Sequence, residues 1–257
     1  MSNTPTFQPA AAGPSRTGTA PGRRVTDAPT RMFHWLFAAS FLGAYLSAGS
    51  EPWRALHVTL GYTLAGLLAF RVVYGMFGPR QAGLGMMARK LASMPAWLSS
   101  LARGIRRQSV AGIPWRQGQN LLMALAVVAL LVLAVPLTLS GYASYNDWAE
   151  FLGGDWISEL HEFFGEVLLA VVLGHVALIA GLSLLRRRNQ ARPMLGGRVD
   201  GPGPDLVRHN RGWLAALLLL AVLAFTAWQW QESPAGLIPA QPWSTGASDL
   251  ERDGDND

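Results

Sequence analysis

Five long apolar segments, separated by polar stretches, dominate the pattern along the chain. They cover Met32 to about Gly49, Ala55 to about Phe77, 121–139, about Leu160 to Leu185, and Gly212 to Gln231. Each is close to the ~20 residues that a helix needs to cross a hydrocarbon core of ~30 Å. Strands of a membrane barrel would instead alternate over ~10 residues. The pattern predicts an all-α integral membrane helical bundle, with the third helix kinked at Pro136 but not interrupted.

The polar stretches divide the rest of the chain. Residues 1–24 are rich in Pro, Gly, Ala, Ser and Thr and lack the apolar centre of a signal peptide, so we expect a disordered tail. Residues 25–190 hold the first four helices and are expected to form a four-helix core. A basic linker (191–211), a fifth C-terminal transmembrane helix (212–231) and an acidic tail (232–257) follow.

Composition supports membrane residence and narrows the chemistry. Half of the residues are hydrophobic and only 14% are charged, against about 25% in soluble domains. The chain has no cysteine, which excludes disulfides, iron–sulfur clusters, thiolate zinc sites and covalently attached c-type haem. Any redox or metal chemistry must therefore use the five histidines and the carboxylates.

The charges are sorted between the two sides of the expected bundle. Segments 1–31, 79–118 and 186–211 contain eighteen of the 21 Arg and Lys residues and only three acids. By the positive-inside rule these segments are cytoplasmic, so the N-terminus is expected inside and the C-terminus in the periplasm of a bacterial inner membrane. The basic runs thus indicate topology. No folded basic module for nucleic acid is visible, and no nucleic-acid partner is expected.

Four histidines lie in or at the ends of the apolar helices. His161 and His175 are fourteen residues apart in the fourth helix, which places them on roughly the same side with a rise of ~21 Å. His161 matches the depth of His57, and His175 matches the depth of His34. Two level pairs, His57 with His161 (outer) and His34 with His175 (inner), suit two stacked bis-histidine haems. The alternative is that each histidine is an interfacial residue at a helix end.

Two glycines and an arginine accompany these histidines. Gly61 follows His57 by one helical turn, and Gly165 follows His161 in the same way. A flat macrocycle beside its ligand needs a neighbour without a side chain, although glycine is also common in membrane helices. Arg71 lies fourteen residues beyond His57. Its guanidinium could pair with a haem propionate, or it could extend to the surface from the helix end.

Three stretches of the chain resemble a known family. VTDAPTRMFHWLFAASFLGAYL, RALHVTLGYTLAGLLAFRVVYGMFGPR and ELHEFFGEVLLAVVLGHVALIAGL are similar to the prokaryotic cytochrome b561 superfamily. Within it they resemble the b-type cytochrome subunits of nickel–iron hydrogenases, formate dehydrogenase and thiosulfate reductase. The resemblance covers about residues 25 to 190. It implies two non-covalent haems b, and the family's ligand pattern falls on His34, His57, His161 and His175.

The resemblance also implies a function. We expect electrons to pass across the membrane between the quinone pool and a partner redox protein, either a periplasmic cytochrome c or a dehydrogenase or hydrogenase subunit. Quinone or quinol would bind near one haem edge. One alternative is a self-sufficient quinone-linked oxidoreductase that acts on a small oxidant such as superoxide. Another is a haem-free membrane scaffold or metal transporter, so the chain's status as an enzyme is left open.

Overall fold

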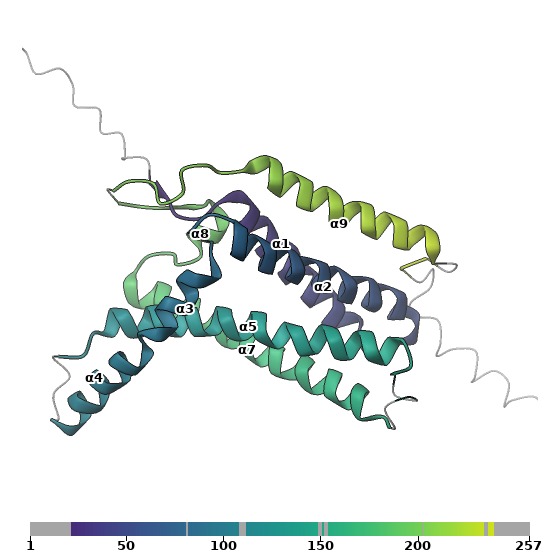
Figure 1. The fold of residues 1–257 in the computed structure, drawn as a ribbon, viewed down its shortest axis with the longest axis horizontal. Helices are drawn as coiled ribbons and strands as arrows, with labels where there is room; N and C mark the ends of the chain where they lie inside the picture. Colours follow the sequence, from purple (N-terminus) through teal and green to yellow (C-terminus); the bar gives the residue numbers. More distant parts are fainter. Residues whose placement is uncertain are drawn as a thin grey trace, which may run out of the picture.

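The computed structural model describes residues 22–80, 82–107, 112–148, 151, 154–201, 203–233 and 236–238. Five long helices coincide with the five apolar segments. They are α1 (Ala28–Ser47), α2 (Arg54–Phe77), α5 (Trp115–Tyr145), α7 (Trp156–Arg186) and α9 (Gly212–Glu232) (Figure 1). The helix α5 extends its segment by six residues at both ends, and α1 and α7 begin four residues earlier than expected. The chain is an all-α helical membrane protein; its described strands are one antiparallel pair of two residues each, β1 (Arg23–Arg24) and β2 (Arg198–Val199).

Four of the long helices are long and apolar enough to cross a membrane. These are α2 together with the 3₁₀ turn η1 (Glu51–Trp53), α5, α7 and α9. The first long helix, α1, is not among them, although it has 20 residues. Arg31, His34 and Trp35 near its start lower its mean hydropathy. The expectation of five spanning helices is therefore met for four.

Local signals account for the ends of α1 and for the length of α5. Asp27 caps the N-terminus of α1, because its Oδ1 accepts a hydrogen bond from the backbone N–H of Thr30 at 3.1 Å. Gly49, with a φ of 73°, follows the end of α1 and turns the chain toward α2. The helix α5 continues through Pro136, as the sequence predicts.

The long helices form two antiparallel pairs with a fifth helix on the outside. One pair is α1 with α2, and the other is α5 with α7, and the two pairs meet where α2 packs on α5. The C-terminal helix α9 lies mainly along α1 (Figure 1). Within the described part of the chain, α7 packs closely along α5 but approaches α1 and α2 only sparsely. The side of α7 that faces α1 and α2 is therefore not closed by backbone packing.

An apolar layer crosses the middle of the bundle. Each of the four core helices contributes one buried side chain, namely Phe41, Leu64, Leu137 and Leu168. Leu168 is fully buried and lies seven residues from both His161 and His175. Leu64 likewise lies midway between His57 and Arg71. We call these four residues the central layer; it separates the polar residues of one half of the bundle from those of the other.

Short elements gather at the end of the bundle where α1 begins. They are α3 (Leu84–Ala92), α4 (Met94–Arg106), α8 (Arg192–Leu195) and the β1–β2 pair (Figure 1). Residues 1–21 of the expected tail lie outside the described residues, whereas its last two, Arg23 and Arg24, form β1. Within the expected linker 191–211, α8 and β2 are ordered, and the Asp205 carboxylate accepts a hydrogen bond from the backbone N–H of Arg24.

A buried polar cluster joins three helices at the same end. Asp27 is only 2% exposed, and its Oδ2 accepts a 2.5 Å hydrogen bond from the hydroxyl of Tyr74 on α2. Arg211, at the start of α9, donates to the same hydroxyl at 3.4 Å. The backbone N–H of Ala28 also donates to the carbonyl of Asn210 at 3.0 Å. The cluster therefore fixes the start of α9 to α1 and α2.

Candidate functional site

The structure places the four helix histidines in two groups on either side of the central layer. His57 and His161 lie at the end of the bundle where α2 and α7 begin, and their ring centres are 6.0 Å apart. His34 in α1 and His175 in α7 lie on the other side of the central layer, toward the opposite end of the bundle. The structure thus brings together the rings of the outer pair that depth along the helices predicts.

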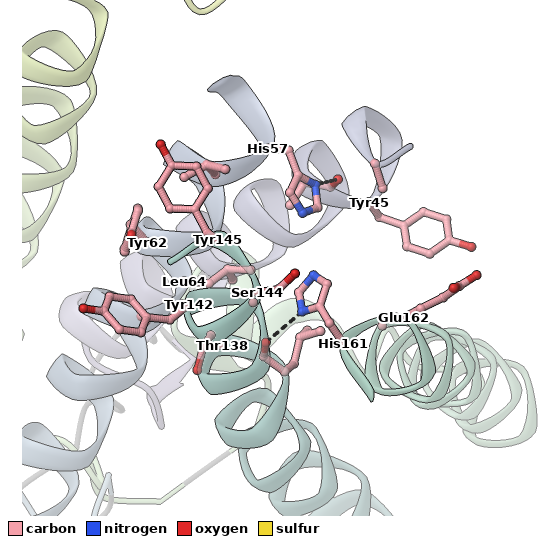
Figure 2. A pocket seen from close by; sticks show the side chains of 18 of the residues that line it. Tyr45, His57, Tyr62, Leu64, Thr138, Tyr142, Ser144, Tyr145, His161 and Glu162 are labelled. Carbon is pink, nitrogen blue, oxygen red and sulfur yellow. Dashed lines mark hydrogen bonds between the residues drawn. The ribbon is translucent and has the colours of Figure 1, made fainter. Parts of the chain in front are cut away.

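Each ring of the outer pair is oriented by a backbone carbonyl of a neighbouring helix. Nδ1 of His57 lies 2.8 Å from the carbonyl oxygen of Ala44 in α1, and Nδ1 of His161 lies 3.0 Å from that of Leu137 in α5. A carbonyl can only accept, so each Nδ1 carries the proton and each Nε2 has a free lone pair. Figure 2 shows the free nitrogens of the two rings facing each other.

This arrangement suits a metal ion held between the two rings. Imidazoles on opposite sides of one metal, with bonds of about 2.0 Å, have ring centres roughly 6 Å apart. A hydrogen bond from the second ring nitrogen fixes the tautomer of a ligating histidine and raises its basicity. Both features are present in the outer pair. Among the described residues, no cluster holds three or more His, Cys, Asp or Glu side chains, so the outer pair can supply two protein ligands.

The surroundings of the two outer histidines repeat from one helix pair to the other. The Ala44 carbonyl also accepts from the hydroxyl of Ser47 at 3.1 Å, and the Leu137 carbonyl accepts from Ser140 at 3.1 Å. In both cases the serine is three residues beyond the carbonyl. The likeness of the sequences around His57 and His161 is therefore accompanied by a likeness in how their rings are held.

A cavity of about 810 Å³ surrounds the outer pair, within the ~300–1,000 Å³ typical of ligand and cofactor sites. Its walls come from α1, α2, α5 and α7, and Tyr45, Tyr62, Tyr142 and Tyr145 contribute to them (Figure 2). Gly61 and Gly165 line it as well. A Cβ atom on Gly61 would meet nothing within 4 Å, and one on Gly165 would meet only Leu137 Cδ1 at 3.9 Å. These two glycines thus leave open space for a flat group beside the histidines.

A third glycine makes room for a ligand ring and was missed in the sequence. A Cβ atom on Gly141 of α5 would lie 2.7 Å from Cε1 and 3.0 Å from Nδ1 of His161. No side chain larger than hydrogen fits there while the ring keeps its hydrogen bond to Leu137. The sequence signal available was a glycine after Ser140 in an otherwise apolar helix, which does not indicate a neighbour on another helix.

The inner pair differs from the outer one. Nδ1 of His34 and Nδ1 of His175 are both buried without a hydrogen-bond partner among the described residues. Unsatisfied buried polar atoms are unusual in folded proteins. The inner rings thus lack, among the residues that the structure describes, the hydrogen bond that orients each outer ring. Within the described chain, no backbone carbonyl holds either inner ring at Nδ1.

Arg71 is placed toward the inner end of α2 and is 4% exposed, so it does not extend to the surface. Its guanidinium donates a 3.0 Å hydrogen bond to the carbonyl of Ala82 and lies near the buried cluster of Asp27 and Tyr74. The fifth histidine, His209, is exposed near the start of α9, away from both histidine pairs.

Comparison with known proteins agrees with the resemblance of the sequence. The family model described as prokaryotic cytochrome b561 matches residues 25–197, more than half of the chain. The matched segment runs from the residues before α1 through the end of α8 and includes both histidine pairs. Searches of curated proteins and of solved structures gave no match.

Proposed function

Because the chain belongs to the prokaryotic cytochrome b561 family, and is thus a multi-pass membrane b-type cytochrome, we propose that it binds two haems b and carries electrons across the bacterial inner membrane. His57 and His161 would hold the outer haem, and His34 and His175 the inner one. The observation that carries the proposal is the outer pair: two imidazoles, each with Nδ1 bound to a carbonyl, face each other across an open cavity.

A bis-histidine haem b accepts and donates one electron at an iron with no open coordination position. The residues of the chain supply what that chemistry requires. The carbonyls of Ala44 and Leu137 hold the outer rings in one tautomer. Gly61 and Gly165 leave room for the macrocycle. The central layer keeps water and ions out of the space between the two pairs.

We assign the two ends of the pathway to the quinone pool and to a partner redox protein, either a periplasmic cytochrome c or a dehydrogenase or hydrogenase subunit. Segments rich in Arg and Lys meet at the end that holds α3, α4 and α8 (Figure 1). This grouping supports a cytoplasmic position for that end, with the outer pair toward the periplasm. We also propose that α1 spans the membrane, because it packs against both α2 and α9, two helices that are apolar enough to cross it.

Arg71 is proposed as a propionate partner of the inner haem, because it is a buried cation toward the inner end of α2. At the outer site, Arg54 lines the cavity and is largely exposed. It is a second candidate for a propionate partner, and the sequence did not single it out.

Haem content of the purified protein tests the proposal. Pyridine haemochrome analysis should give about two haems b per chain, released by acid and organic solvent because no cysteine attaches them. A preparation without haem that is still folded would contradict it and favour a scaffold or transporter. Quinol oxidation by a small oxidant such as superoxide, with no partner protein present, would instead favour a self-sufficient oxidoreductase.

A further inference from the structure

The segment between α2 and α5 contains two amphipathic helices, α3 and α4, that the haem sites do not use. In α4, Leu98, Leu101 and Ile105 lie on one face, and Ser99, Arg103 and Arg106 lie on the opposite one. Part of the apolar face is not covered by the protein, because Leu98 is 48% and Ile105 is 69% exposed. A monomeric soluble surface rarely leaves such side chains together in water.

Both helices are held against the ends of membrane-spanning helices. A Cβ atom on Gly75 of α2 would lie 2.6 Å from Leu84 Cγ, so α3 packs directly on α2. A Cβ atom on Gly118 of α5 would lie 2.5 Å from the indole of Trp97, so α4 packs directly on α5. These contacts fix α3 and α4 near the membrane boundary.

The length of α5 places its contact with α4 at the level of the lipid headgroups. The 31 residues of α5 extend over ~46 Å at 1.5 Å per residue, compared with ~30 Å for the hydrocarbon core and ~40–45 Å with the headgroups. Gly118 is three residues from the start of α5. The contact between α4 and α5 therefore lies at the level of the headgroups, next to the acyl chains.

Charge indicates which lipids cover this surface. Residues 79–118 contain seven Arg and Lys residues and no Asp or Glu. Arg89 and Lys90 are in the last turn of α3, and Arg103 and Arg106 in the last turn of α4. Among the described residues none of these four forms a salt bridge. Basic residues beside an exposed apolar face are typical of helices that lie in an anionic membrane surface.

We propose that α3 and α4 form an interfacial anchor, with Leu98 and Ile105 inserted among acyl chains and the arginines bound to anionic lipid headgroups. The surface is distinct from both histidine pairs, and the proposal does not depend on haem binding or on the direction of electron flow. Burial of the same face by a second protein, in place of lipid, is the alternative outcome of the test.

The absence of native cysteine allows a direct test with the full-length protein. Single cysteines would be introduced by Leu98→Cys, by Ile105→Cys and, as a matched control on the polar face, by Ala96→Cys, which is also an exposed position. Each would be labelled with an environment-sensitive fluorophore. The proteins would be placed in vesicles of phosphatidylcholine with or without phosphatidylglycerol, with no other protein present.

With phosphatidylglycerol, labels at 98 and 105 should shift to the blue and be quenched by a lipid-bound quencher, whereas the label at 96 should be quenched by aqueous iodide. Adding Arg103→Gln and Arg106→Gln should reduce the fraction of labels inserted in lipid. Each lost charge should lower the equilibrium constant for insertion by about fivefold. Water-exposed labels at 98 and 105 in anionic vesicles would overturn the proposal. They would indicate that a protein partner, and not lipid, covers the apolar face of α4. Elution volume and circular dichroism confirm that each variant is folded.

Discussion

At the scale of single residues, the carbonyls of Ala44 and Leu137 determine which nitrogen of each outer histidine is free. Because both rings donate from Nδ1, both offer Nε2, and the outer pair is set up as a ligand pair by the backbone alone. Nδ1 of His34 and of His175 has no such partner among the described residues. The two pairs therefore differ in how firmly their rings are held, although both consist of imidazoles at matching depth.

Replacing one inner histidine should separate the two proposed haems. His175→Ala should lose the inner haem and keep the outer one, because the central layer and the Nδ1 hydrogen bonds of His57 and His161 do not involve His175. Haem content should fall from two to one per chain, with the outer haem's absorbance band unchanged. His34→Ala should remove the same haem as His175→Ala. If it instead matches His161→Ala, the assignment of pairs is wrong.

The open space beside Gly61 gives a test that separates haem binding from folding. Gly61→Leu should fill the cavity and lower outer-haem occupancy strongly, while the protein remains folded because no protein atom lies within 4 Å of the added Cβ. Gly66→Leu is the matched control, since Gly66 is on the same helix, is exposed and also has nothing within 4 Å. Equal haem loss in both variants would argue against Gly61 as part of the site.

At the scale of elements, the attachment of α9 depends on a few polar contacts at its start. Tyr74→Phe removes the hydrogen bond to Asp27 and leaves that buried carboxylate without one of its donors. We expect the free energy of unfolding to fall by about 1–3 kcal/mol, measured by denaturant titration in mild detergent. Tyr145→Phe, at a residue that is 48% exposed, should change it little. Similar losses in the two variants would mean that the Asp27 contact contributes nothing specific.

The number of spanning helices sets the location of the chain ends. If α1 crosses the membrane together with α2, α5, α7 and α9, an odd number of spans places the N- and C-termini on opposite sides. Reporter fusions at each end should then show a cytoplasmic N-terminus and a periplasmic C-terminus. Both ends on the same side would mean that only the four helices with clear membrane-spanning character cross the bilayer.

At the scale of the whole molecule, the long helices were predictable because uninterrupted runs of about 20 apolar residues are typical of membrane-spanning helices. The depth pairing of the histidines followed from helical rise alone. The helices α3 and α4 were not predicted, because they are 9 and 13 residues long and rich in basic residues, so that charge concealed their apolar faces. The carbonyls that orient His57 and His161 could not be predicted. Every residue has a backbone carbonyl, so the sequence does not indicate which one accepts a hydrogen bond from a histidine.

The central layer has an electrical consequence. The two histidine pairs are separated along α7 by ~21 Å, which is about two thirds of a hydrocarbon core of ~30 Å. Phe41, Leu64, Leu137 and Leu168 lie between them with further apolar side chains packed against this layer, so most of the membrane voltage falls between the two pairs. One elementary charge moved from pair to pair would gain or lose about 1.5 kcal/mol per 100 mV, two thirds of the full transmembrane value. The membrane voltage would therefore bias which of the two proposed haems holds the electron.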